Sequence, residues 1–117
     1  MWVREMLRCR NDKGLMQQVY DLVQRIPEGR VMSYGQVGDW MEPPLSARMV
    51  GRVMYHAPHG VPWWRVVGKE GDLLIIKRDA HMAALQRELL MQEGVPFLED
   101  GRVDMQSCRW QPFEEER

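Results

Sequence analysis

Side chains able to react or to hold a metal are few, and their spacing fits no catalytic set. His56, His59 and His81 form no pair at metal-ligand spacing with a third candidate nearby. Cys9 and Cys108 lie too far apart along the chain for a metal cluster or a disulfide scaffold. The sequence therefore predicts no metal and no cofactor.

The charge distribution suits a polyanion partner without identifying one. Residues 1–58 carry eight Lys and Arg against six Asp and Glu, whereas residues 80–117 carry four against eight, within a net charge of −1. One side of a predicted helix presents Arg48 and Arg52, and Gly51 between them leaves room for close approach or for helix packing. Ordinary surface scatter with an acidic tail would give the same balance.

The elements that must position these residues are mainly helical. Apolar periodicity and capping residues predict four helices. They run from an N-cap at Asn11 or Asp12 to Pro27, from Ser33 to about Met41, from Ala47 (after Ser46) to about His56, and from Asp79 to Gly94. Trp40 and Met49 are expected to face inward.

A hairpin is predicted from two β-prone runs, residues 65–67 and 73–76, around the Gly-rich turn 68–72. The second and third helices, joined by a turn that contains proline, fit a helix-turn-helix. A hairpin after a helix-turn-helix is the layout of a winged helix. The expected fold is therefore mainly α with a small β-hairpin, a winged helix-turn-helix.

The chain has the size and composition of one globular domain. It has 117 residues and 13.8 kDa, with 44% hydrophobic and 28% charged residues. We expect a single domain over residues 1–117, with a core at about 11–95 and an irregular tail at 96–117 that Trp110 and Phe113 pin to the body. No apolar run is long enough to span a membrane, and the first residues lack a signal pattern. We expect a cytoplasmic monomer, associated with the nucleoid in a bacterium.

Four blocks of sequence, in order, resemble the DNA-binding domain of O6-alkylguanine-DNA alkyltransferases. They are residues 26–37 (IPEGRVMSYGQV), 47–51 (ARMVG), 61–67 (VPWWRVV) and 89–95 (LLMQEGV). In the active enzymes the third block reads Pro-Cys-His-Arg-Val, and its cysteine accepts the alkyl group. Trp63 stands at that position. This replacement is the mark of alkyltransferase-like proteins, which bind alkylated guanine in DNA without repairing it.

The resemblance implies that the chain is not an enzyme. Alkyl transfer needs a thiolate, which the family activates through a histidine, a glutamate and an asparagine. At the matching positions stand Trp63 for the nucleophile, Trp64 for the histidine and Ala57 for the asparagine. Only Glu93 matches the family's glutamate, and an indole offers neither a nucleophile nor a base at neutral pH.

The resemblance also assigns a DNA-binding surface and a lesion pocket. A base modified at O6 must leave the stack to enter a closed pocket. Tyr34 matches the tyrosine at the flipped base and 3′ phosphate, and Arg48 matches the finger that fills the vacated stack through the minor groove. The expected DNA-binding residues are Tyr34, Arg48, Ser33, Gly51 and Arg52, and the expected lesion pocket, between the third helix and the hairpin, has Tyr34, Trp63, Val66 and Arg78.

The implied partners are double-stranded DNA with O6-alkylguanine and the nucleotide excision repair proteins that receive the lesion. Three other functions remain open. A winged-helix transcription factor would prefer one undamaged sequence. A residual transferase would use Cys9 or Cys108, and a protein-interaction domain would have lost DNA binding.

Overall fold

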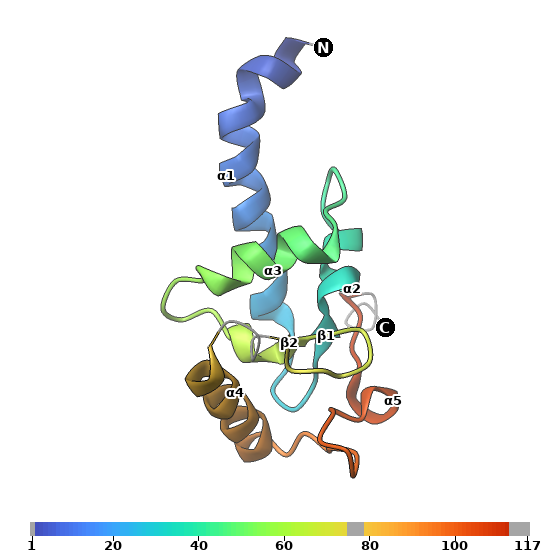
Figure 1. Cartoon of the computed structure of the whole chain (residues 1–117). Helices are drawn as coiled ribbons and strands as arrows, with labels where there is room; N and C mark the ends of the chain where they lie inside the picture. Colours follow the sequence, from blue (N-terminus) through green and yellow to red (C-terminus); the bar gives the residue numbers. More distant parts are fainter. Residues whose placement is uncertain (1, 75–78, 113–117) are drawn as a thin grey trace.

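The protein is mainly helical, and its long first helix projects from a body that surrounds a small parallel sheet (Figure 1). The computed structural model describes the backbone of residues 2–74 and 79–112, and the side chains from residue 14 onward within these ranges. The elements are α1 (Trp2–Arg25), β1 (Met32–Ser33), α2 (Tyr34–Asp39), α3 (Ala47–Tyr55), the 3-10 helix η1 (Trp63–Arg65), β2 (Val66–Val67), α4 (Ala80–Gln92) and α5 (Met105–Cys108). No helix in the described ranges is long and apolar enough to cross a membrane.

Helix α1 starts earlier than the sequence predicts. It begins at Trp2, so the expected N-cap at Asn11 or Asp12 is wrong. The first half of α1 stands clear of the body (Figure 1). The apolar stripe by which a helix is recognised in sequence therefore starts only at Leu15, where α1 reaches the core. Most of the stripe faces inward as predicted, since Val19 and Val23 are both fully buried, but Met16, which the stripe also includes, is 36% exposed.

The predicted helix-turn-helix is present as α2 and α3. The hydroxyl of Ser33 accepts a hydrogen bond from Gln36 N, and the Gln36 side chain accepts one from Ser33 N, which completes a capping box. Ser46 caps α3 as predicted, accepting from Met49 N. The turn between the helices is tight at Gly38, where a Cβ would lie 2.1 Å from the carbonyl oxygen of Leu45.

Two apolar side chains of these helices do not face the core. Trp40 is 47% exposed and Met49 is 43% exposed, so the expectation that they face inward is wrong. Helix α2 ends at Asp39, before Trp40, so helical periodicity no longer sets the direction of that side chain. Met49 lies in the first turn of α3, where Val50 and Met54 already fill the inward face.

The sheet pairs strands other than those of the predicted hairpin. Strand β2 runs parallel to β1, with Met32 opposite Val66. The chain does turn after β2, since Gly68 N donates to the carbonyl oxygen of Asp72 at 2.8 Å. Residues 73–74 nevertheless form no strand, and residues 75–76 lie outside the described residues. Both strands are fully buried, which is typical of parallel pairing, and the sequence pattern of a buried run does not reveal its partner.

The C-terminal segment is part of the packed structure, and the expectation that it is irregular is wrong at α5. Val31 donates to the carbonyl oxygen of Cys108 and accepts from Trp110 N, so the segment lies along the chain just before β1. Trp110 is 2% exposed within the core cluster of α1, α2 and α3, which confirms it as an anchor. Phe113 lies outside the described residues. A second cluster joins β2, α4 and the C-terminal segment.

Candidate nucleic-acid interface

Helix α3 presents the predicted basic surface. Arg48 and Arg52 are exposed and four positions apart, so they lie on one face of the helix. Tyr55, seven positions after Arg48, is 44% exposed on that face and contacts the ring of His56 edge-on at 5.3 Å. Sequence reasoning did not single out Tyr55, although its spacing from Arg48 is the signal that would have found it.

Helix α3 is fixed to α1 by the hydroxyl of Tyr20, which donates to Val53 O at 2.9 Å.

Gly51 has no packing reason within the described chain to be a glycine. Apart from its own helix backbone and its chain neighbours, no described atom lies within 4 Å of the place that a Cβ would take. A glycine inside a helix costs about 1 kcal/mol relative to alanine. Packing of α3 against another described element therefore does not explain Gly51. The explanation that is left is the close approach of an external group to the backbone of α3.

The remaining residues expected at this surface come from the start of α2. Tyr34 is half-buried and packs against the core cluster under α3. Ser33 is only 5% exposed, and its hydroxyl is used in the capping box, so its visible role is to begin α2 at Tyr34. Ser33 as a DNA contact stays a prediction.

The predicted pocket residues come from η1 and β2. Trp63 is half-buried and packs on the same core cluster as Tyr34, so two predicted pocket residues share one support. Val66 is fully buried, and its backbone N–H donates to Trp63 O while its carbonyl accepts from the Gln86 side chain. The backbone of Val66 therefore holds η1 against α4. Arg78 lies outside the described residues, and its role stays a prediction.

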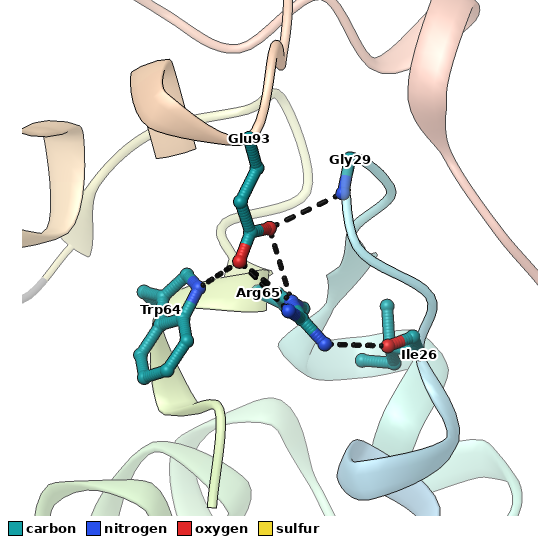
Figure 2. A network of polar contacts seen from close by, with 5 residues as sticks. All are labelled: Ile26, Gly29, Trp64, Arg65 and Glu93. Atoms are coloured by element: carbon teal, nitrogen blue, oxygen red, sulfur yellow. Dashed lines mark hydrogen bonds and ion pairs between the residues drawn. The ribbon is translucent and has the colours of Figure 1, made fainter. Parts of the chain in front are cut away.

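Trp64, whose role the sequence did not explain, donates its indole N–H to Glu93 at 2.8 Å (Figure 2). Arg65 forms an ion pair with the same carboxylate at 2.7 Å and also donates to the carbonyl oxygen of Ile26. Gly29 N donates to the other carboxylate oxygen at 3.2 Å. Glu93 thus joins the end of α4 to η1 and to the turn after α1. We call Trp64, Arg65, Glu93 and Gly29 the Glu93 network.

This network keeps Glu93 ionised. Burial by itself would raise the pKa of Glu93, but hydrogen bonds from Arg65, Trp64 and Gly29, with the charge of Arg65, outweigh it and hold the pKa below its usual value. A carboxylate with a lowered pKa is a weak base. Both of its oxygens are already occupied by hydrogen bonds from Trp64, Arg65 and Gly29.

Cys108 is unsuited to act as a nucleophile. It is 2% exposed, and its thiol donates to the carbonyl oxygen of Asp104 at 3.3 Å. Burial, with the charge of Asp104, raises the pKa of Cys108, so the thiol stays protonated at neutral pH. The side chain of Cys9 lies outside the described side chains. No group of three or more His, Cys, Asp or Glu within the described ranges could hold a metal ion.

Comparison with known proteins supports the resemblance seen in sequence. The family model for the DNA-binding domain of 6-O-methylguanine DNA methyltransferase matches residues 14–95. The DNA base-flipping protein of Escherichia coli is 38% identical over 105 residues, which cover 88% of this chain and 79% of that protein. Alkyltransferase-like protein 1 of Schizosaccharomyces pombe is 34% identical over 102 residues, covering 81% of this chain and 93% of that protein.

A solved structure matches the fold as well. The crystal structure of S. pombe Atl1 in complex with damaged DNA that contains O6-carboxymethylguanine superimposes with a TM-score of 0.70 at 31% identity. The match covers 86% of this chain and 97% of that chain. The winged helix-turn-helix class predicted from the sequence is confirmed by this match together with α2 and α3.

Proposed function

The chain belongs to the 6-O-methylguanine DNA methyltransferase family as an alkyltransferase-like member, and we propose that it binds O6-alkylguanine in double-stranded DNA by base flipping, without repairing it. The observation that carries the proposal is the face of α3, where exposed Arg48 and Arg52 flank Gly51. Two guanidinium groups beside an open backbone suit a phosphate-lined groove. The relatives named for base flipping, and the one solved with damaged DNA, support the same function.

Base flipping assigns separate tasks to three residues. Taking a nucleotide out of the stack costs a few kcal/mol, and less when the base is damaged and pairs poorly. Arg48, in the first turn of α3, enters the vacated space, where its planar guanidinium stacks and donates hydrogen bonds. Tyr34, at the start of α2, meets the backbone beside the flipped nucleotide. Trp63 forms a wall of the pocket that receives the base.

The same geometry argues against alkyl transfer. An indole at position 63 offers no nucleophile, and the indole of Trp64 uses its one donor on Glu93. The buried, protonated thiol of Cys108 does not replace the missing cysteine. We therefore assign the chain to recognition rather than to enzymatic repair.

A lesion that is bound but not repaired needs a second system to remove it. In our proposal the protein is a cytoplasmic or nucleoid-associated monomer that marks the lesion for nucleotide excision repair. The resemblance to alkyltransferase-like proteins is the support for this partner. A winged-helix transcription factor on the same fold would instead prefer one undamaged sequence and ignore the O6 group.

The finger assignment is tested by comparing Arg48→Ala with Arg52→Ala. Both variants remove one positive charge from the same exposed face of α3. Loss of charge alone weakens all DNA similarly and lowers the salt slope by about one phosphate contact. Only Arg48→Ala is expected to lower the ratio of lesion to undamaged affinity and the unstacking signal of a fluorescent base analogue beside the lesion. Equal weakening of both duplexes by Arg48→Ala, with the unstacking signal intact, would make Arg48 a phosphate contact.

A further inference from the structure

The Glu93 network ends in an aromatic contact at the predicted pocket. The rings of Trp64 and Trp63 meet edge to face, with centroids 5.9 Å apart and planes at 87°. Trp63 packs against the core cluster of α1, α2 and α3, while Trp64 packs against the cluster of β2, α4 and the C-terminal segment. The pair therefore connects the two cores of the protein at the residue assigned to the pocket wall.

The residues that hold Trp64 are largely buried and hydrogen-bonded. The side chains of Glu93 and Arg65 are only 10% and 15% exposed, and both carboxylate oxygens of Glu93 accept hydrogen bonds. In Figure 2 the indole of Trp64 and the backbone of Gly29 lie on either side of the carboxylate. Gln86, 1% exposed, fixes the backbone below by donating to the carbonyl oxygen of Trp64 at 3.2 Å.

We propose that Trp64 is a positioning residue of the lesion pocket: Glu93 holds its indole N–H, and its ring holds Trp63 edge-on in the orientation that receives the flipped base. This inference rests on the proposed function. Among the described residues, the charged groups found against Trp64 are Arg65 from η1, whose guanidinium carbon lies 5.6 Å from the centre of its ring, and Glu93 from the end of α4. Because an indole does not titrate, we expect its contact with Trp63 to persist from weakly acidic to weakly basic pH.

Two substitutions separate the hydrogen bond from the ring. Trp64→Phe keeps an aromatic edge and removes the donor, while Glu93 retains Arg65 and Gly29, so the fold is expected to persist. Trp64→His keeps a donor, because Nε2 of an imidazole lies where Nε1 of an indole lies relative to Cβ. Trp40→Phe, at a 47% exposed tryptophan outside the pocket, is the matched control for the loss of an indole.

The experiment measures affinity for duplexes with and without O6-methylguanine, for all four proteins, together with thermal unfolding. We expect Trp64→Phe to lower the lesion-to-undamaged ratio by about 3- to 10-fold, which is the net value of one hydrogen bond. Trp40→Phe is expected to leave the ratio unchanged. An unfolding temperature close to that of the wild type would show that Trp64→Phe keeps the fold.

Trp64→His provides the second test. We expect a ratio near that of the wild type at pH 8, because neutral imidazole can still donate Nε2–H to Glu93. His56 and His59 are present in both proteins, so the difference isolates position 64. An unchanged ratio in Trp64→Phe, or a ratio in Trp64→His at pH 8 as low as that of Trp64→Phe, would overturn the positioning role alone. A wild-type ratio of one would overturn the proposed function and this inference with it.

Discussion

Replacing Gly51 with alanine separates the stability of α3 from its contact with DNA. The added methyl group meets no described atom within 4 Å outside its own helix backbone and chain neighbours, so it creates no clash. Alanine is the better helix former, and Gly51→Ala is expected to raise the free energy of unfolding by about 0.5–1 kcal/mol. Urea or thermal unfolding measures this gain. Most surface substitutions that weaken binding show no such gain.

DNA binding is expected to change in the opposite direction. If a phosphate approaches the backbone at Gly51, the methyl group moves the DNA outward and lengthens the contacts of Arg48 and Arg52. Loss of about one hydrogen bond to a charged group weakens binding ~10-fold. Both duplexes should weaken alike, because phosphate contacts carry no information about the base.

Gly14→Ala is the matched control for this experiment. Gly14 lies inside α1, and a Cβ there also meets no described atom within 4 Å outside its own helix backbone and chain neighbours. It should stabilise the protein by a similar amount and leave DNA affinity unchanged. If Gly51→Ala stabilises the protein and binds DNA as tightly as the wild type in a fluorescence anisotropy titration, no close approach occurs at α3 and the reasoning fails.

Two further predictions concern the lost chemistry and the Glu93 network. Trp63→Cys alone is expected not to restore efficient alkyl transfer, because Trp64 and Ala57 leave the thiol without an activating base; rapid methylation of this variant, measured by mass, would show that the network is not needed. Glu93→Gln is expected to lower the free energy of unfolding by about 1–3 kcal/mol near neutral pH. Since the pKa of Glu93 is lowered on folding, its contribution is present above the usual value of 4.5 and is lost as pH falls through the folded value. The stability difference from the wild type should therefore shrink in acid, and a constant difference would contradict the ion-pair assignment.

Local signals in the sequence predicted the helices because capping and periodicity act within a few residues. Ser33, Ser46 and Asp79 all cap helices in the structure. The strand pairing was wrong because β1 and β2 are short and buried, and their pairing depends on tertiary packing rather than on a turn. A buried strand gives the same apolar run in the sequence whether it pairs within a hairpin or with a strand that lies far away along the chain.

The candidate site was predictable only in part. The block around Trp63 predicted a pocket wall, which stays a prediction, and α3 bears Arg48 and Arg52 on one exposed face. The partner of Trp64 was not predictable, because Glu93 follows it by 29 positions and the contact depends on how α4 packs on η1. That no described atom packs against Gly51 could likewise be seen only in the packed structure.

The central claim is tested most directly by competition binding of the wild-type protein to two duplexes that differ only by a single O6-methylguanine. We expect the lesion duplex to compete at a lower concentration, and the mass of the protein and the amount of lesion to be unchanged after incubation. Equal competition by the two duplexes would contradict lesion recognition. A methyl adduct on the protein that matches the lesion lost would contradict recognition without repair.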